Sequence, residues 1–409
     1  MFRSARGAIS PPLCTAREYL RMTSRTELLL ALLVSLNTCS CSLFSPKEPV
    51  RLPVSEYPHL LDSSQAQVVF NYARHFPNET QLSLCIIIGD SEKYVGIERR
   101  NDSLVYINNR DSVFEIGSIT KTFTGTMLAK MVYDGTVDRD DPIKKFLPVR
   151  LRQSSLDGIE MTLAHLANHT SGLPFEPGNV RDNKDHPFDP YIPYRYYDTT
   201  MLYDYLSNQL ALQSTPGEKR SYSNLGGGLL GHILTLISEK SYEELLFETI
   251  CGPLGMRSTF VTSTGERVRL IVRGRDPRGQ ILPLDGGDCG ALTGAGGIKS
   301  SVQDLVKYLK ANMRDTTYLF LAQKATKRFD EHFTGGLGWA TYSDRGKNHV
   351  GAFGGTGGFT SGVIFERNER VGLVVLTNVS AFAASPGNYT EKLCRALYDP
   401  LPFAAGRKE

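Results

Sequence analysis

Hydrophobic residues follow two patterns along the chain, continuous apolar runs typical of buried strands and the wider spacing typical of helices. Residues 82–89 form an apolar run that predicts a buried strand, and residues 93–100 predict its hairpin partner. Residues 362–366 and 371–378 flank a polar turn and predict a second hairpin. Between the hairpins, apolar residues recur mainly at helical spacing. The expected helices are Ser63–Phe76, residues 118–133, Thr199–Asn208, Gly227–Glu239, Tyr242–Ile250, Ser301–Met313 and Thr390–Leu397, with short strands at Arg267–Arg273 and Gln280–Leu282.

This order predicts an α/β (α+β) fold in which an antiparallel sheet is flanked by helices and interrupted by an all-helical domain. The sheet domain is expected to comprise residues 62–147 and 260–400, and the helical domain residues 148–259. Residues 1–44 are expected to be a signal or targeting segment, residues 45–61 a linker, and residues 401–409 a tail. A cleft between the two domains is the expected place for a site.

The N-terminal segment has the layout of a secretory signal. Arginines are spread over residues 1–27, an apolar core follows at residues 28–36, and small and polar residues come next. Met22 would give a more compact signal. An uncleaved membrane anchor over residues 28–45 and a mitochondrial transit peptide are the alternatives. We therefore expect a secreted protein that contacts a membrane only if this segment is retained.

Composition restricts the class of function. The chain has 409 residues, of which 41% are hydrophobic and 22% charged, as in a soluble globular protein. A net charge of +3 without a long basic run argues against a nucleic-acid partner. Four cysteines after the leader could form two disulfides or be small buried side chains: Cys85, Cys251, Cys289 and Cys394. Asn-x-Ser/Thr glycosylation motifs begin at Asn78, Asn101, Asn168, Asn378 and Asn388.

The candidate nucleophile is Ser118, at the point where a loop turns into a helix. Lys121 follows one helical turn later, so its amine lies within reach of the Ser118 hydroxyl. A serine hydroxyl needs a neighbouring base to become a nucleophile, and unpaired N–H groups at a helix start favour developing negative charge. Serine is also a common helix N-cap, so this pair has a structural explanation as well.

Two nucleotide-like motifs are excluded. Gly226, Gly228 and Gly231 match a dinucleotide fingerprint, but a polar turn precedes them where an apolar strand is required. Residues 294–300 lack the glycine that comes directly before lysine in a phosphate loop. The sequence also lacks a metal-binding pattern of histidines or cysteines, so we expect neither a metal nor a cofactor.

Two further segments could act with the nucleophile. Tyr222 and Asn224 come just before a helix, where a tyrosine could transfer protons and an asparagine could orient a carbonyl group. A turn followed by an asparagine N-cap is the structural alternative. Gly354, Gly355 and Thr356 precede the last hairpin, where a strand edge could offer an N–H group to a bound carbonyl or simply turn.

In this order, the motifs resemble those of serine hydrolases related to class C beta-lactamases, D-alanyl-D-alanine carboxypeptidases and family esterases. The resemblance covers roughly residues 65–395. It rests on residues 114–121 (FEIGSITK), 163–174 (LAHLANHTSGLP), 216–224 (PGEKRSYSN), 253–256 (PLGM), 294–297 (GAGG), 336–339 (GLGW) and 356–359 (TGGF).

The resemblance implies a beta-lactamase/transpeptidase-like fold and a metal-free reaction through an acyl-enzyme. Ser118 would attack a carbonyl carbon, Lys121 would act as its base, and Tyr222 would share proton transfer to the leaving group. Asn224 would bind substrate and hold Lys121. The backbone N–H group of Ser118 and that of Gly355 would together form an oxyanion hole. Gly355 lies in the segment Gly354–Thr356.

One position departs from the family pattern. The third family motif usually carries Lys or His where this chain has Ala352, and His349, three residues upstream, would face the other side of a strand. Because that cation typically meets a substrate carboxylate, its loss favours a neutral ester or amide, or weak activity. The stretch 175–197 could line the cleft and accept an apolar acyl group, or be a packed surface loop. Its aromatic residues include Phe188, Tyr191, Tyr194, Tyr196 and Tyr197.

We therefore predict a serine hydrolase that forms an acyl-enzyme at Ser118 and hydrolyses an ester or amide bond. Lactams and peptides are among the candidate substrates, and the expected partner is a small molecule or peptide. The alternative is a catalytically weak or inactive protein of the same fold that serves in binding or scaffolding.

Overall fold

The computed structural model describes residues 61–101, 103–283, 289–344, 346–382 and 389–401, all within one compact unit, Val50–Glu409. The predicted targeting segment 1–44 lies outside the described residues, as do nearly all of the linker and tail and the glycosylation motif at Asn388. Within the described part, no helix is long and apolar enough to cross a bilayer.

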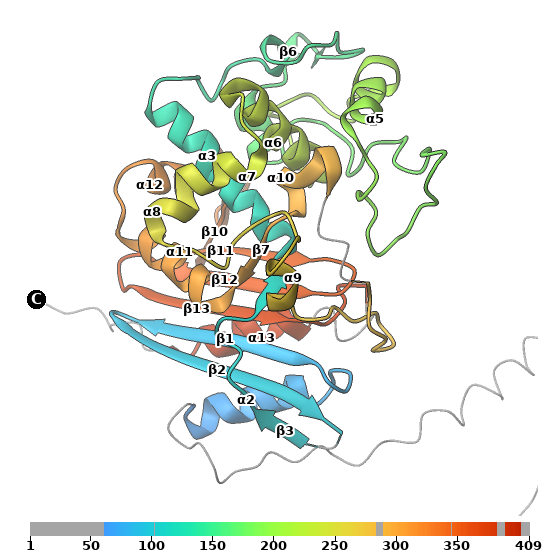
Figure 1. Cartoon of the computed structure of the whole chain (residues 1–409). Helices are drawn as coiled ribbons and strands as arrows, with labels where there is room; N and C mark the ends of the chain where they lie inside the picture. Colours follow the sequence, from blue (N-terminus) through green and yellow to red (C-terminus); the bar gives the residue numbers. More distant parts are fainter. Residues whose placement is uncertain (1–60, 102, 284–288, 345, 383–388, 402–409) are drawn as a thin grey trace, which may run out of the picture. The chain divides into compact units, whose positions relative to one another are not determined.

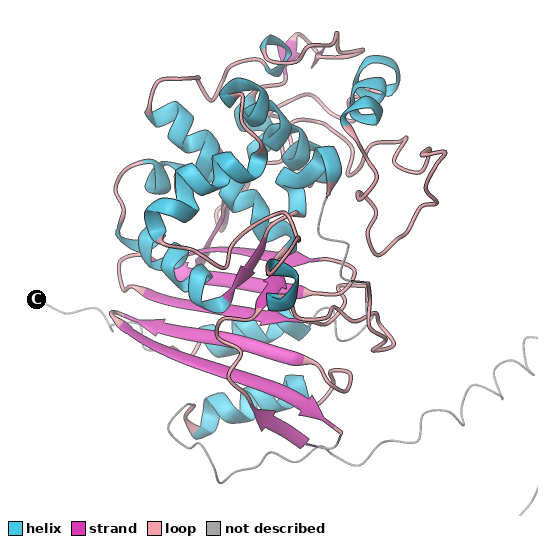
Figure 2. Cartoon of the chain, viewed as in Figure 1, coloured by secondary structure: helices cyan, strands magenta, loops and turns pink. Residues whose placement is uncertain are grey.

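Nine strands of the described residues form one antiparallel sheet, in the order β3-β2-β1-β13-β12-β11-β10-β9-β8 (Figures 1 and 2). Both predicted hairpins, β1–β2 and β12–β13, are confirmed. The two hairpins meet in the middle of the sheet, where β1 pairs with β13 and Leu84 lies opposite Val375. The strands are β1 (Gln81–Ile88), β2 (Ser91–Arg100), β3 (Ser103–Tyr106), β8 (Lys327–Arg328), β9 (Phe333–Gly335), β10 (Ala340–Asp344), β11 (Lys347–Gly355), β12 (Thr360–Glu366) and β13 (Val371–Thr377).

Helices cover both faces of this sheet, which explains why its central strands are mostly apolar and are buried along nearly their whole length. Along β13, Leu373 and Val375 face a cluster formed with α2 (Ser63–Ala73) and α13 (Tyr389–Tyr398). The alternate residues of β13 face the larger cluster formed with α3 (Thr120–Tyr133) and α11 (Val302–Arg314). In Figure 1, α3 lies above the sheet, whereas α13 is drawn at the level of β1 and α2 between β2 and β3.

The predicted helices between the hairpins are confirmed, and two of them end in a π-helical turn. Where the helical domain begins and ends stays a prediction. The remaining elements are two short strand pairs, β4 (Val113–Glu115) with β7 (Lys299–Ser301) and β5 (Ser155–Leu156) with β6 (Ile159–Glu160), together with the helices and helical turns η2 (Gly117–Ile119), η3 (Ile143–Lys145), α4 (Leu163–Ala167), α5 (Thr199–Asp204), η4 (Tyr205–Gln209), α6 (Asn224–Ser238), α7 (Tyr242–Leu246), η5 (Phe247–Cys251), α8 (Gly252–Leu254), α9 (Arg267–Leu270), η6 (Gly290–Leu292), α10 (Thr293–Gly296) and α12 (Tyr318–Gln323).

The two short strands predicted after the helical stretch are wrong. Arg267–Leu270 forms the short helix α9, and Ile281 makes only an isolated bridge with Arg275. Arginines alternate with apolar residues in this segment, which imitates a strand. A strand also needs a partner along its length, and here Ile271 makes a single bridge with Val113.

The cysteines form no disulfide within the described residues. Cys85, Cys251 and Cys394 are buried thiols, and burial raises the pKa of Cys251 to about 12. Cys289 is partly buried and lines the pocket described below. The alternative interpretation, that these cysteines are small buried side chains, therefore fits the three buried ones.

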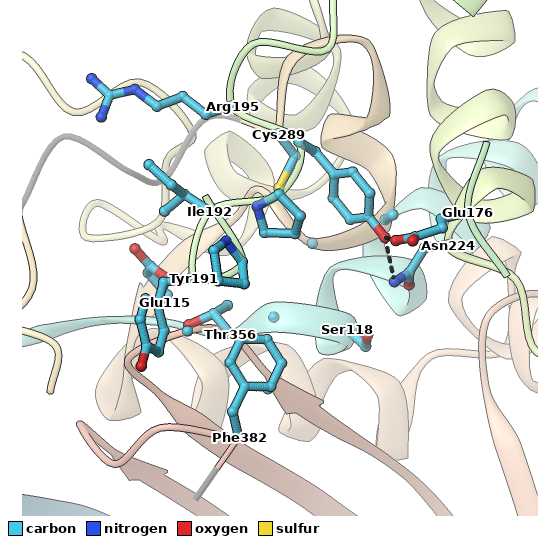
Figure 3. A pocket seen from close by; sticks show the side chains of 18 of the residues that line it. Glu115, Ser118, Glu176, Tyr191, Ile192, Arg195, Asn224, Cys289, Thr356 and Phe382 are labelled. Atoms are coloured by element: carbon cyan, nitrogen blue, oxygen red, sulfur yellow. Dashed lines mark hydrogen bonds between the residues drawn. The ribbon is translucent and has the colours of Figure 1, made fainter. Parts of the chain in front are cut away.

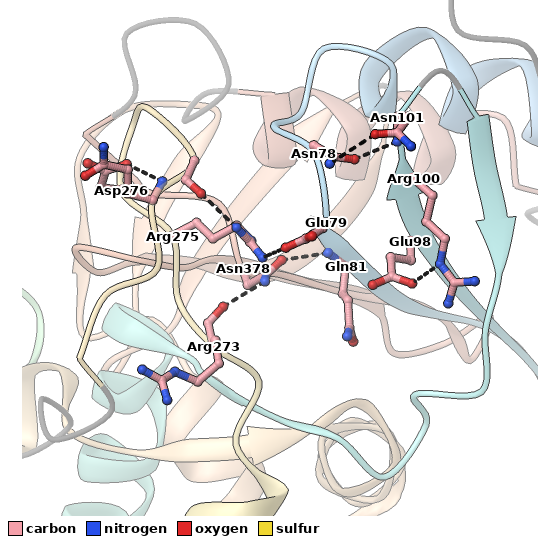
Figure 4. A network of polar contacts seen from close by, with 12 residues as sticks. Asn78, Glu79, Gln81, Glu98, Arg100, Asn101, Arg273, Arg275, Asp276 and Asn378 are labelled. Carbon is pink, nitrogen blue, oxygen red and sulfur yellow. Dashed lines mark hydrogen bonds and ion pairs between the residues drawn. The ribbon is translucent and has the colours of Figure 1, made fainter.

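Burial also makes the asparagines of two glycosylation motifs inaccessible. Asn168 and Asn378 are almost fully buried, and the Asn378 side-chain amide donates a hydrogen bond of 2.8 Å to the Arg273 carbonyl oxygen (Figure 4). Asn78 and Asn101 are exposed and lie side by side, with the Asn101 N–H donating to Asn78 Oδ1 at 2.6 Å. Of the motifs in the described part, these two present accessible asparagines.

Candidate active site

Ser118 lies in the 3₁₀ turn η2, which leads directly into α3. The regular helix therefore begins at Thr120, two residues later than predicted. The Ser118 side chain does not cap this helix. Its Oγ accepts hydrogen bonds from Lys121 Nζ at 3.0 Å and from the Tyr222 hydroxyl at 2.6 Å. The N-cap explanation for this serine is wrong.

Lys121 is held on the serine by a set of neutral acceptors. Its side chain is 5% exposed, and Nζ donates to Ser118 Oγ, to Asn224 Oδ1 at 2.8 Å and to the Ala295 carbonyl at 2.7 Å. Nζ also lies 4.9 Å from the centre of the Tyr222 ring. Among the described residues, no carboxylate forms an ion pair with this amine. The amine is thus aimed at the serine by neutral hydrogen-bonding groups and not by a counter-charge.

The start of α6 positions the two residues of the second motif. Ser223 is the N-cap of this helix, because its Oγ accepts a hydrogen bond of 2.8 Å from the Gly226 N–H. The predicted asparagine cap is therefore wrong. Asn224, the first helical residue, bridges two side chains instead. Its Oδ1 accepts from Lys121, and its Nδ2 donates to the Tyr194 hydroxyl at 3.1 Å.

The end of β11 lies against the serine backbone. A Cβ atom on Gly354 would lie 2.9 Å from the Ser118 nitrogen, and one on Gly117 would lie 2.6 Å from the Gly355 nitrogen. Only glycine allows this approach. The Thr356 N–H donates to the Phe359 carbonyl at 2.9 Å, so the next pair along β11, at Gly355, is a non-hydrogen-bonded pair. The Gly355 N–H therefore points away from β12, towards the serine side.

His169 packs under the tyrosine. Its ring centre lies 4.3 Å from that of Tyr222, and its Nδ1 accepts a hydrogen bond of 3.3 Å from the Ser223 N–H. Desolvation, together with the nearby Lys121 and Arg220 cations, holds the pKa of His169 well below its usual range. Because Nδ1 accepts this hydrogen bond, the imidazole is neutral in the folded protein.

We expect the stability of the protein to fall in mild acid because of this histidine. The unfolded chain binds the proton near pH 6.5, whereas the folded state binds it only at lower pH. The stabilisation is therefore complete above about pH 6.5 and is lost as the pH falls through the window below it. Thermal denaturation between pH 8 and pH 5 should show a shallower decline of stability for His169→Asn, because asparagine does not bind a proton in this range. Asparagine is chosen because it tolerates the positive φ of 64° at this position. Parallel declines in both proteins would contradict this assignment.

A pocket of about 720 Å³ opens beside Ser118 (Figure 3). Ser118, Asn224 and Glu176 lie along one side of it, and Tyr191, Thr356 and Phe382 along the other. Most of its wall is apolar, and ten of its 22 lining residues come from the stretch 175–197, as one of the two alternatives for this stretch predicts. The apolar and aromatic lining residues are Phe175, Phe188, Pro190, Tyr191, Ile192, Pro193, Tyr194 and Phe382. Tyr197 is buried beneath the loop, and Tyr196 stacks on His186.

A smaller cavity of about 180 Å³ lies on another side of the same serine. Ala352 lines it, whereas His349 contacts Tyr398 of α13 on the opposite face of the sheet. This confirms that His349 cannot take the place of the missing family cation, because neighbouring positions along a strand alternate between faces.

The roles of two site residues could not be predicted from local patterns. Tyr194 holds Asn224 and donates to Glu176 Oε2 at 3.4 Å, and burial raises the pKa of its phenol. The Ala295 carbonyl holds Lys121. The sequence singled out Tyr194 as a cleft residue and residues 294–297 as a family motif, but their contacts with Asn224 and Lys121 join segments far apart in the chain and depend on the fold. Within the described residues, no cluster of three His, Cys, Asp or Glu side chains could hold a metal ion.

A serine nucleophile bonded to a lysine and a tyrosine, with backbone N–H groups beside it, defines a serine hydrolase that needs no histidine base. The profile of the beta-lactamase family matches residues 93–392, and the chain belongs to this family. It is 29% identical over 378 residues to the D-alanyl-D-alanine-carboxypeptidase/endopeptidase AmpH of Escherichia coli K12, covering 86% of this chain and 91% of that protein.

Other known proteins agree with this assignment. A beta-lactamase of Pseudomonas fluorescens is 28% identical over 268 residues, which cover 64% of this chain and 69% of that enzyme. The crystal structure of a beta-lactamase/D-alanine carboxypeptidase from Yersinia pestis superposes with a TM-score of 0.64 at 23% identity, covering 82% of this chain and 98% of that one. The structural likeness confirms the predicted fold, an antiparallel sheet with helices on both faces.

Proposed function

We propose that this protein is a serine acyl hydrolase that cleaves an ester or amide with an apolar acyl group at Ser118. The observation that carries the proposal is the hydrogen-bonded set of Ser118, Lys121, Tyr222 and Asn224 at the edge of an apolar pocket. The two relatives compared above are named as a D-alanyl-D-alanine carboxypeptidase and a beta-lactamase. The acyl pocket of this chain points to a different substrate class.

The reactive form of Lys121 is the neutral amine. In the first half-reaction, Ser118 Oγ forms a bond to the carbonyl carbon while its proton passes to Lys121 Nζ. The carbonyl oxygen becomes negative and is stabilised by the backbone N–H groups of Ser118 and Gly355. Gly354 and Thr356 hold this segment of β11 next to the serine. As the intermediate collapses, the bond to the leaving group breaks, and the proton taken up by Lys121 passes through the Tyr222 hydroxyl to the departing atom, which leaves both groups as they began.

In the second half-reaction, water adds to the carbonyl carbon of the acyl-enzyme. The same basic groups take a proton from the water, and Ser118 Oγ leaves with a proton. Asn224 keeps Lys121 in place through its Oδ1 throughout the cycle. The products are a carboxylic acid and an alcohol or amine, and no cofactor takes part in any step.

The apolar wall determines which acyl groups fit. Phe175 and Phe382 are more than half exposed at the pocket, so a bound acyl chain would cover apolar surface that now meets water. Glu115 and Glu176 also line the pocket, and burial raises the pKa of Glu115. Arg181 and Arg195 line the same pocket, so its basic and acidic side chains balance, and the apolar wall rather than charge selects the acyl group.

A series of p-nitrophenyl esters tests this proposal. From acetate to octanoate, kcat/KM is expected to rise by up to about fourfold per methylene, because each buried CH₂ contributes about 0.8 kcal/mol. The Tyr191→Ala variant should flatten this rise, since Tyr191 lines the pocket. The matched control Tyr196→Ala changes an aromatic residue of the same loop that does not line the pocket. A rate that is independent of chain length would contradict the acyl pocket, and no turnover of any ester would favour the scaffolding alternative.

A further inference from the structure

The two cavities beside Ser118 differ in charge. The large pocket is lined by Glu115 and Glu176 as well as by arginines. The small cavity is lined by the cationic side chains of Lys121 and Arg220 and by no Asp or Glu. Both cavities include Ser118 and Tyr222 in their walls. A substrate bound across the serine would therefore place one end in a pocket whose acidic and basic side chains balance, and the other end beside basic side chains alone.

Arg220 is the residue that gives the small cavity its available charge. Lys121 already donates to three acceptors, whereas Arg220 makes no hydrogen bond or ion pair with the described residues. Its guanidinium carbon lies 5.0 Å from the centre of the Phe333 ring, which keeps the side chain over the cavity. Its charge also lowers the pKa of His169, the histidine packed under Tyr222, so the guanidinium lies near the reacting groups.

The rest of the cavity wall is shaped for an apolar group. Phe333 stacks on Phe329 and on Tyr342, with ring centres 5.2 Å and 5.0 Å apart. Ala352 lines the cavity with only a methyl group, at the position where the family usually has a long cation. The small side chain leaves space next to Tyr222, the residue assigned to protonate the leaving group.

We infer that the small cavity is a leaving-group subsite in which Arg220 binds an anion, with a carboxylate on an apolar amino acid as the fitting class. This inference rests on the proposed acyl-enzyme function. The substrate would be an N-acylated amino acid or short acylated peptide, with its acyl chain in the large pocket. In hydrolysis the amide C–N bond breaks, the amine leaves protonated, and water supplies the oxygen of the fatty acid. Ala352 on β11 has no charge with which to bind the carboxylate. In this chain Arg220, in the loop before Tyr222, would bind it instead.

The test compares N-octanoyl-phenylalanine with N-octanoyl-phenylalaninamide, each as the L and the D isomer. The two compounds differ only in the charge of the leaving group. We expect kcat/KM to be about 10- to 100-fold higher for the free carboxylate, the range typical of a hydrogen bond between charged groups. In Arg220→Gln this ratio should fall to near one. The matched control Lys219→Gln removes an exposed charge from the neighbouring position, which lines neither cavity, and should keep the wild-type ratio.

Hydrolysis of p-nitrophenyl octanoate separates the two possible failures. If the wild type cleaves this ester but shows no preference for the carboxylate compound, or cleaves neither amide, the subsite is overturned and the acyl hydrolase is not. If Arg220→Gln keeps the wild-type ratio, the anion is bound elsewhere, and the inference about Arg220 is overturned. If neither the ester nor the amides are cleaved by a folded protein, the proposed function fails, and the subsite fails with it.

Discussion

Ser118→Ala is expected to abolish formation of an acyl-enzyme and to lower kcat/KM for p-nitrophenyl octanoate by about 10⁴-fold or more. The serine hydroxyl is the only group to which both the Lys121 amine and the Tyr222 hydroxyl donate among the described residues. Alanine leaves the pocket and the backbone N–H groups in place but removes the atom that becomes acylated. Intact-mass spectrometry after a fluorophosphonate probe, together with the steady-state rate, measures both effects.

Ser238→Ala is the matched control for this substitution. Ser238 lies at the end of α6, and its hydroxyl donates to the Leu234 carbonyl, away from the site. This variant should be labelled like the wild type. Equal labelling of the wild type and Ser118→Ala would show that another nucleophile reacts, and the assignment of Ser118 would be wrong.

Lys121→Met is expected to lower kcat/KM by about 10³-fold and also to reduce stability. Methionine fills a similar volume but cannot accept the proton of Ser118. The substitution also leaves Asn224 Oδ1 and the Ala295 carbonyl without their donor, at a cost of about 1–3 kcal/mol for each buried group. Rates of ester hydrolysis and thermal denaturation of the same sample separate the chemical effect from the structural one.

Lys121→Arg distinguishes a base from a fixed positive charge. Arginine keeps the charge, but its guanidinium does not lose a proton in proteins. If Lys121 is the base, this variant should be as slow as Lys121→Met. Recovery of the wild-type rate by arginine would mean that the lysine acts through its charge alone, and the base would have to be sought at Tyr222.

The two hairpins and most helices could be predicted because their signals are local. A run such as Leu82–Ile88 is apolar at every position except Ser83, and few structures other than a strand buried on both faces suit such a run. The spacing of Ser118 and Lys121 was equally informative, because three residues of helical backbone bring their side chains together wherever the helix lies. The wrong predictions were strands for which the fold supplies no neighbouring strand. The segment Arg267–Arg273 alternates like a strand, but it forms a short helix and makes one isolated bridge.

What the sequence alone determined is the list of reactive groups, their order along the chain and the absence of a cation at Ala352. Which of these groups meet was decided only by the tertiary structure, because β11, α6 and α10 converge on the turn η2 from distant parts of the chain. The same convergence separates two cavities with different charges and places Arg220 beside Ala352. Contacts of this kind depend on how the sheet and the helices pack, and no spacing within one segment encodes them.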